Sequence, residues 1–175
     1  PKLQGETLLN KKVGIIGVGN IGKKIFEMLM GFETIKYAND IKIINQSFLK
    51  RHKIKQVSKK KIFRESDILI TASDLNKSSY HLINKKTLKL TKKNVLIVNI
   101  SRGSLIDNNA LIKFLEKNPH SGACLDVFEN EPLKRNSKFL RLKNCMLTSH
   151  NAFNTYHEVE KTHTNTINNI LKILR

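Results

Sequence analysis

The sequence predicts an α/β fold in which a doubly wound parallel sheet carries helices on both faces. Short apolar runs alternate along the chain with segments of helical period, and this alternation is typical of buried parallel strands joined by crossover helices. Capping and turn residues separate the two kinds of segment. The length of 175 residues fits one domain of ordinary size.

In the first half of the chain, short β-branched runs bounded by glycine or polar residues predict strands. These strands are expected at residues 13–17, 34–39, 54–57 and 68–72. Helical spacing predicts helices at residues 21–30 and 60–65. In the first helix the apolar face is predicted to hold Ile21, Ile25, Met28 and Leu29, with Gly31 as the C′ residue. Residues 41–53 show no clear period and are expected to form a loop.

The second half repeats the alternation, with clearer capping signals. A short helix is expected at residues 85–90 after Asn84, and Asp107 is suited to cap a helix that runs to about Lys117 before Asn118-Pro119. Buried strands are expected at residues 95–99, 123–127 and 146–148. A long helix from Tyr156 to the C-terminus carries an apolar stripe of Val159, Ile167, Ile170, Leu171 and Leu174.

The most specific motif is GVGNIG at residues 17–22, which stands between the first predicted strand and the first predicted helix. This is the context that the dinucleotide-binding fingerprint requires. Gly17 permits the tight turn, Gly19 lets a pyrophosphate approach the backbone, and Gly22 lets the helix pack closely on the sheet. The free N–H groups and the positive dipole end of the helix then face the phosphates. We therefore predict a Rossmann-type domain.

Asp40 supports this interpretation and indicates NAD as the cofactor. It follows the second predicted strand, about 20 residues after the last glycine, where the fingerprint has an acidic residue that binds the adenosine ribose. A carboxylate there also repels the 2′-phosphate of NADP. The alternative is that Asp40 merely opens the following loop. Nearby basic residues such as Lys36, Lys42 and the cluster at residues 50–53 can soften the discrimination between the two cofactors.

The net charge of +18 raises nucleic acid as a possible partner. The lysines are spread along the whole chain, with dense runs at residues 50–61 and 85–93, and few aromatic residues interleave with them as stacking platforms would. We therefore expect a solvated basic surface and no specific nucleic-acid site, with non-specific binding to polyanions at low salt.

The cysteine count and the hydropathy pattern indicate a cytoplasmic protein. Cys124 and Cys145 are interpreted as small core residues in a reducing compartment, with no disulfide and no metal site. No apolar run is long enough to span a membrane, and no signal peptide is recognised. The expected partners therefore include no membrane.

Polar residues gather where three predicted strands end, at residues 99–104, 126–132 and 148–153. Ligands of parallel sheets bind beyond the carboxyl ends of the strands, so Arg102, a carboxylate and His150 are expected to meet there. A guanidinium binds a carboxylate bidentately, and an imidazole exchanges protons near neutral pH. Taken singly, Arg102 also fits a solvated turn, Glu129 and Glu131 fit surface acids, and His150 fits an ordinary loop residue.

Four ordered motifs resemble the D-isomer-specific 2-hydroxyacid dehydrogenases from about Leu9 to Asn154: GVGNIG, NISRGSLID, GACLDVFENEP and TSHNAF. The resemblance implies a catalytic set of Arg102, Glu131 and His150, in which Glu131 is chosen over Glu129 by its position before the proline. It also implies that Asp126 faces the nicotinamide carboxamide. The expected NAD-binding residues are Gly17, Gly19, Asn20, Ile21, Gly22, Asp40, Ala72, Ser73, Ile100, Ser101, Arg102, Asp126 and His150. The other histidines, at positions 52, 81, 120, 157 and 163, are interpreted as structural or solvated.

The chain departs from the family pattern in two loops and in length. Ser149 stands before the histidine where the family usually has proline, which is expected to loosen His150, and Asp74 brings a negative charge near the substrate carboxylate. Residues 1–153 are predicted to form the NAD-binding domain. Residues 154–175 are predicted to form a helix that in relatives returns to a substrate domain, which is expected to be absent from this chain.

These observations favour one function and leave two others open. The first is the NAD-binding half of an oxidoreductase that transfers hydride between NAD(H) and a 2-hydroxy or 2-oxo acid, in a homodimer formed through the NAD-binding domain and with weak or no turnover by this chain alone. The second is a non-catalytic NAD(H)-binding sensor or scaffold of the same fold. The third is polyanion binding as the main function, which affinity for a DNA duplex at physiological salt would decide. No metal is expected.

Overall fold

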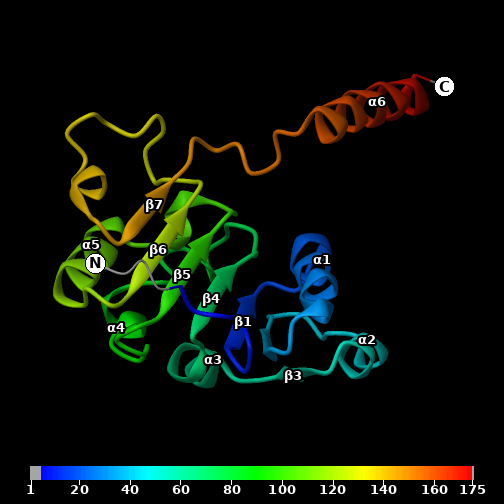
Figure 1. Ribbon diagram of the computed structural model, residues 1–175. Helices are drawn as coiled ribbons and strands as arrows, with labels where there is room; N and C mark the ends of the chain where they lie inside the picture. The colour runs from blue at the N-terminus through cyan, green and yellow to red at the C-terminus, as the bar shows by residue number, and fades with distance from the viewer. Residues whose placement is uncertain (1–4, 175) are drawn as a thin grey trace.

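The computed structural model describes residues 5–174 of the chain. Within these residues the strands form one fully parallel sheet in the order β3-β2-β1-β4-β5-β6-β7 (Figure 1). The strands are β1 (Lys12–Ile16), β2 (Ile35–Asn39), β3 (Ile54–Gln56), β4 (Ile68–Thr71), β5 (Leu96–Asn99), β6 (Gly122–Leu125) and β7 (Cys145–Leu147). The predicted doubly wound α/β sheet is confirmed. Its order reverses between β1 and β4, and such a reversal marks the crevice where these sheets bind ligands.

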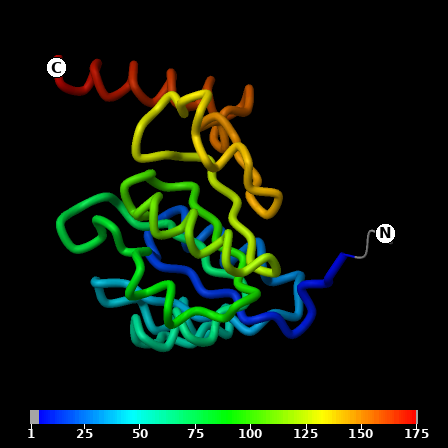
Figure 2. Tube along the Cα trace, turned by 90° about the vertical axis from the view of Figure 1, so that its left-hand side faces the viewer, coloured from blue at the N-terminus to red at the C-terminus, as the bar shows by residue number. Residues whose placement is uncertain are grey.

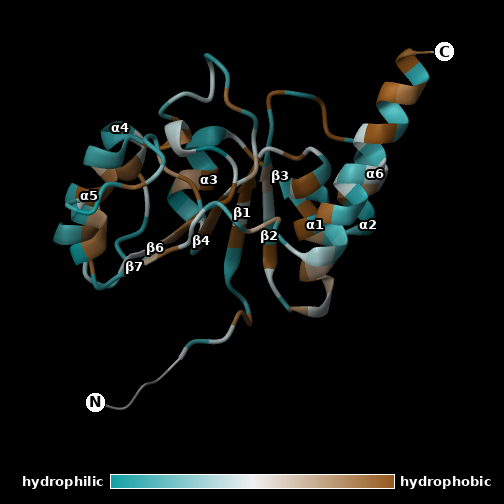
Figure 3. Ribbon diagram, turned by 90° about the horizontal axis from the view of Figure 1, so that it is seen from above, coloured by the Kyte–Doolittle hydropathy of each residue, from teal (hydrophilic) through white to brown (hydrophobic). Residues whose placement is uncertain are grey.

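Helices cover both faces of this sheet, as the apolar runs of the strands predicted. They are α1 (Asn20–Met28), α2 (Gln46–Arg51), α3 (Lys59–Glu65), α4 (Lys85–Leu88), α5 (Asn108–Lys117) and α6 (Tyr156–Ile173). Shorter 3₁₀ turns lie at Leu29–Gly31, Gly103–Leu105 and Lys138–Arg141. Helices α1 and α2 lie against one face, and α3, α4 and α5 lie against the other (Figure 3).

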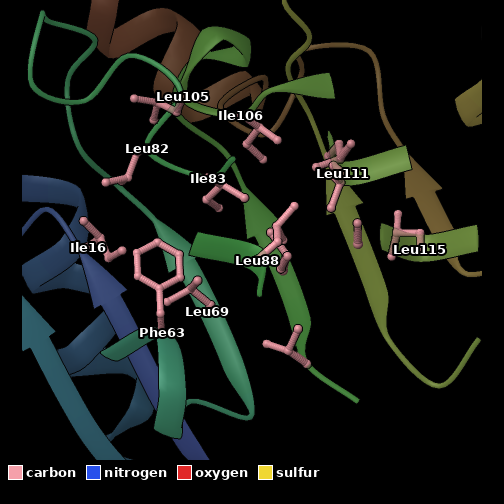
Figure 4. Packing of buried hydrophobic residues seen from close by; sticks show 14 of the residues in the cluster. Ile16, Phe63, Leu69, Leu82, Ile83, Leu88, Leu105, Ile106, Leu111 and Leu115 are labelled. Carbon is pink, nitrogen blue, oxygen red and sulfur yellow. The ribbon is translucent and has the colours of Figure 1, made fainter. Parts of the chain in front are cut away.

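The hydrophobic core is divided into two clusters by the sheet. Along β1, Val13 and Ile15 point into the cluster beneath α1 and α2, whereas Ile16 points into the other cluster. This alternation follows from the two-residue period of a strand. The larger cluster packs α3, α4 and α5 on the sheet, and Phe63, Leu69 and several other fully buried side chains meet there (Figure 4).

Side-chain caps fix where several helices begin. The Asp107 carboxylate accepts a hydrogen bond from the N–H of Ala110 at 3.0 Å, so the predicted cap of α5 is confirmed. The Asn84 side chain caps α4 through the N–H groups of Lys86 and Thr87. Each cap satisfies a backbone donor that the helix itself leaves without a partner.

Three expectations about the first half of the chain are wrong. Residues 41–53 contain helix α2, whose N-cap is Asn45, because Leu49 packs into the core beneath it. Gly31 is not a left-handed C′ residue, because α1 ends at Met28 and passes into a 3₁₀ turn. The predicted face of α1 is wrong in part: Ile25 and Leu29 do pack against the core, but Ile21 and Met28 are exposed, and the fully buried side is formed by Gly22 and Phe26.

Helix α6 extends away from the sheet and has no buried residue (Figure 2). Its predicted apolar side chains Ile167, Ile170, Leu171 and Leu174 are all exposed. The stripe predicted from the sequence is therefore present on the helix, but it does not pack against the described part of this domain. Among residues 5–174, no helix combines the length and apolar character needed to cross a membrane.

Candidate active site

The glycine turn after β1 has the geometry that its motif predicted. Gly17 has a φ of 93°, and a Cβ on it would lie 2.5 Å from the backbone nitrogen of Ser73. A Cβ on Gly22 would lie 2.1 Å from the carbonyl oxygen of Gly17. A Cβ on Gly19 would meet nothing within 4 Å. The first and last glycines are thus required by close packing, whereas the backbone at the middle one is open to an approaching group.

The N-terminus of α1 has the donors that a pyrophosphate needs. Helix α1 starts at Asn20, its N-cap Gly19 provides no side-chain hydrogen bond, and its first turn contains no acidic residue. The first N–H groups of such a helix and its dipole favour an anion. Ile21 is 56% exposed and adjoins these groups. Of the predicted cofactor residues in this turn, Gly19, Asn20 and Ile21 are therefore exposed at the carboxyl edge of β1, while Gly17 and Gly22 are buried beneath them.

Asp40 lies directly beside this turn. Its Oδ2 accepts a hydrogen bond from the N–H of Val18 at 2.6 Å, and its Oδ1 accepts one from the N–H of Lys42 at 2.7 Å. The first bond links the carboxylate to the glycine turn, and the second holds the following loop. The ribose role and the loop role predicted for Asp40 are therefore compatible. The same carboxylate holds the following loop and lies beside the glycine turn.

A buried hydroxyl group supports a ligand at the same place. Ser73 lies against Gly17 and, together with Asp40 and Lys59, lines a hollow next to the glycine turn. Its Oγ is buried and has no hydrogen-bond partner among the described residues. A buried hydroxyl without a partner is unfavourable by about 1–3 kcal/mol. The residues present therefore fit a polar nucleotide at this site. Ala72, also predicted as a cofactor residue, precedes Ser73 and is half-buried.

A buried polar network shapes the turn that carries Arg102. Thr71 Oγ1 donates to Asn99 Oδ1 at 2.9 Å, and both residues are fully buried. Asn99 Nδ2 donates to the carbonyl of Arg102 at 3.0 Å, and Ser101 Oγ donates to the carbonyl of Thr71 at 2.7 Å. Sequence reasoning placed both residues in polar turns at strand ends, but it did not foresee the contact between them. Ile100 and Ser101, which were predicted to contact NAD, belong to this turn and are half-buried.

His150 and Glu131 form the contact that the sequence predicted. The distance from His150 Nδ1 to Glu131 Oε2 is 2.8 Å. Glu131 Oε1 also accepts a hydrogen bond from the N–H of Phe128 at 2.8 Å. These two bonds, the backbone one first, hold the pKa of Glu131 below its ordinary value. Glu131 is thus an anion that fixes the imidazole through Nδ1, and Nε2 is the ring nitrogen that remains for a substrate.

Asp126 holds the loop on both sides of His150. Its carboxylate accepts hydrogen bonds from Thr148 Oγ1 at 2.5 Å and from the N–H groups of Asn151 and Ala152 at 3.0 Å, and its carbonyl accepts the N–H of His150 at 2.8 Å. Burial opposes ionisation, but the three carboxylate bonds outweigh it, so the pKa of Asp126 lies below its usual value. The contact with the nicotinamide carboxamide stays a prediction. Holding the loop is a role that sequence reasoning missed.

The loop has a second constraint at His150 itself. Its φ is 55°, a left-handed conformation that is uncommon for a residue other than glycine. The ring also makes an edge contact with Phe153, with 6.3 Å between the ring centroids. The loosening expected from Ser149 stays a prediction, and the residues on both sides of this loop are bonded to Asp126.

Arg102 lies at the same edge of the sheet but, within residues 5–174, makes no hydrogen bond or salt bridge with the His150–Glu131 pair. The side chain is exposed, and within residues 5–174 its only hydrogen bond runs from Nη1 to the neighbouring carbonyl of Ser101, at 2.7 Å. The two turns meet through the backbone, because Gly103 packs on the peptide after Phe128. The site is thus a hydrogen-bonded imidazole–carboxylate pair with an exposed guanidinium at the same edge of the sheet.

A hollow of about 590 Å³ adjoins the pair. Apolar side chains, with Phe128, Leu133, Leu140 and Leu147 among them, line it next to Glu131 and His150. Among residues 5–174, no group of three or more His, Cys, Asp or Glu side chains is placed to hold a metal ion.

Comparison with known proteins identifies the family. The model of the D-isomer specific 2-hydroxyacid dehydrogenase NAD-binding domain matches residues 1–152. The chain belongs to this family. It is a NAD-binding domain of the D-isomer-specific 2-hydroxyacid dehydrogenases, and the family predicted from its four motifs is confirmed.

The relatives also show how much of such a protein this domain represents. A glyoxylate reductase from Pyrococcus horikoshii is 36% identical over 152 residues, which are 83% of this chain and 43% of that protein. A D-lactate dehydrogenase structure from Escherichia coli is 31% identical with a TM-score of 0.87, covering 98% of this chain and 54% of the other. The NAD-complexed family member from Lactobacillus delbrueckii is 27% identical with a TM-score of 0.87, covering 99% and 56%. The chain spans about half the length of these proteins.

Proposed function

We propose that the protein to which this NAD-binding domain belongs transfers hydride between NADH and a 2-oxo acid, and in reverse between a D-2-hydroxy acid and NAD. The observation that carries the proposal is the 2.8 Å contact of His150 Nδ1 with the anionic Glu131. It leaves Nε2 as the proton donor for a carbonyl oxygen. The relatives named as glyoxylate reductase and D-lactate dehydrogenase support the same substrate class.

Each residue of the set has a defined task. The glycine turn and Asp40 bind the dinucleotide, which supplies the hydride when bound. The Arg102 guanidinium binds the substrate carboxylate and polarises the neighbouring carbonyl. His150 gives its proton to the developing alkoxide in reduction and removes it in oxidation, while Glu131 keeps the ring oriented and stabilises its charged form. Asp126 maintains the loop on which His150 is carried.

The test uses the complete protein with NADH and glyoxylate. His150→Ala and Arg102→Ala are each expected to lower kcat/KM by roughly 10²–10⁴-fold, because each removes a group that acts on the reacting atoms. Glu131→Gln, which keeps the size but removes the charge, is expected to have a smaller effect. His120→Ala is the matched control, since His120 is exposed and lies away from these turns.

A wild-type protein that binds NADH and reduces no 2-oxo acid would instead support the sensor or scaffold. Binding of a DNA duplex tighter than micromolar at physiological salt, without NADH binding, would favour a nucleic-acid function over both, whereas micromolar or weaker binding with a steep salt dependence would mean charge alone. For the 175-residue chain alone we expect NADH binding with weak or no turnover, because substrate positioning and exclusion of water depend on a second domain.

We also propose that the protein acts in the cytoplasm as a homodimer. Two free, half-buried thiols on neighbouring strands support a reducing compartment: burial raises the pKa of Cys145 to about 12 and also raises that of Cys124. The exposed apolar side chains of α6 support association. Light scattering on the eluted protein measures the oligomeric state, and a monomer at all concentrations would contradict the dimer.

A further inference from the structure

A second histidine–glutamate pair joins the loop that carries Glu131 to the segment between β4 and α4. His81 Nε2 is 2.5 Å from Glu129 Oε1, and Glu129 stands two positions before Glu131. The side chains of His81 and Glu129 are 30% and 23% exposed, against 43% and 35% for His150 and Glu131. The second pair is therefore the better covered of the two, and of the two interpretations that the sequence left open for His81, structural or solvated, the contact with Glu129 supports the structural one.

Glu129 also connects this pair to helix α5. Its Oε2 accepts a hydrogen bond from the N–H of Asn108, the first residue of that helix, at 3.3 Å. A carboxylate at a helix N-terminus is favoured by the unpaired N–H groups and by the helix dipole. One side chain thus links the loop of residues 126–132 both to His81 and to α5.

The turn that carries Arg102 lies between His81 and the backbone that leads into Glu129. On one side the N–H of His81 donates to the carbonyl of Ser104 at 2.9 Å. On the other side a Cβ at Gly103 would lie 1.8 Å from the backbone carbon of Phe128, so the turn packs directly on the peptide that leads into Glu129. The side-chain contact between His81 and Glu129 closes a ring around residues 102–104.

The backbone conformation of His81 indicates that the position of this residue is constrained. Its φ of 46° lies in the left-handed region, where a residue other than glycine is less stable by about 1 kcal/mol or more unless its surroundings hold it. Here Asn84 Nδ2 donates to the carbonyl of His81 at 2.7 Å, and the ring of Tyr80 stacks on the His81 imidazole at 4.0 Å. These contacts direct the imidazole toward Glu129.

We propose that His81 and Glu129 are positioning residues that hold the Arg102 turn in register with the His150–Glu131 pair. The inference rests on the proposed function, because it concerns the geometry of that reaction. Arg102 reaches only its neighbour Ser101 within the described residues, so the place of its guanidinium depends on where the turn is held. A displacement of about 1 Å between reacting groups lowers a rate by roughly 10²-fold.

The test compares His81→Leu with His81→Gln in the complete protein. Leucine removes the hydrogen bond at similar size, and kcat/KM for glyoxylate is expected to fall roughly 10²-fold, with the dissociation constant of NADH unchanged. Glutamine can still donate an N–H to Glu129, so it is expected to recover most of the rate. Equal losses in both variants, or a loss in His81→Leu that only follows reduced thermal stability, would overturn the proposal. His120→Leu is the matched control and should behave as wild type.

A second readout does not require turnover. The imidazole carbon signal of His150, followed by NMR and assigned with His150→Gln, is expected to shift in His81→Leu and in Glu129→Leu but not in His120→Leu. If the wild-type protein reduces no 2-oxo acid, the proposed function fails, and this signal still decides the positioning role. An unchanged His150 signal in both variants would refute it.

Discussion

The substitution Asp126→Asn tests how the His150 loop is held. The aspartate carboxylate receives Thr148 Oγ1 and the N–H groups of Asn151 and Ala152. An asparagine keeps one oxygen for the first two donors, but it turns an NH₂ group toward the N–H of Ala152. One charge-assisted bond is then lost and two become neutral. Such bonds contribute about 1.5–3 kcal/mol each when charged and about 1 kcal/mol when neutral.

The expected destabilisation is about 3 kcal/mol, because contributions within one network do not add fully. For a domain of this size that corresponds to a fall in Tm of about 6–12 °C. Thermal unfolding of this chain followed by circular dichroism at pH 7 measures it. Asp74→Asn is the matched control, since Asp74 is exposed and its carboxylate accepts no hydrogen bond among the described residues.

The pH dependence of the melting temperature provides a second test. The pKa of Asp126 is lowered in the folded state, so its stabilisation is present above the ordinary value of about 3.9 and is lost as the pH falls through the lowered folded value. The difference in Tm between wild type and Asp126→Asn should therefore shrink between about pH 4 and pH 2. Equal melting temperatures at pH 7, or a difference that stays constant down to pH 2, would refute this account of the loop.

Three further predictions follow from single contacts. Gly103→Ala places a Cβ against the backbone of Phe128 and is expected to destabilise the chain by about 3 kcal/mol in urea unfolding; an unchanged midpoint would contradict the packing. Asp40→Asn removes the charge next to the N–H of Val18 and should raise the affinity for NADPH relative to NADH by about tenfold, measured by calorimetry. Cys145, with a pKa of about 12 caused by burial, should react with a thiol reagent at pH 8 about 10³-fold more slowly than an ordinary cysteine until urea unfolds the chain.

The strand positions were the most predictable part of the fold, because buried parallel strands must be short, apolar and rich in β-branched residues. Each predicted strand is present with ends that differ by one or two residues, as for Val13–Gly17 against Lys12–Ile16. Capping residues such as Asp107 were equally predictable from the sequence, because a cap acts on the backbone of its own helix. Helix α2 was missed because its six residues are held mainly by packing against the core.

The side of α1 that faces the sheet shows where sequence reasoning ends. The hydrophobic period placed Ile21 and Met28 inward, yet Gly22 and Phe26 are buried. Close approach of the helix to the glycine turn requires the glycine on the inner side, and this packing constraint overrides side-chain hydropathy. For α6 the apolar stripe itself could be predicted from the sequence. Whether the stripe packs against this domain depends on tertiary contacts that no local pattern specifies.

The sequence by itself determined the family, the sheet and the chemical groups of the site, because motifs of six to eleven residues fix glycine turns and place Arg102, Glu131 and His150 after strand ends. Only the tertiary structure decided how those groups are held. The bonds of Asp126 around His150, the buried Thr71–Asn99 contact and the His81–Glu129 pair each join residues more than twenty positions apart. Such contacts depend on which strands become neighbours, and a local sequence pattern carries no information about them.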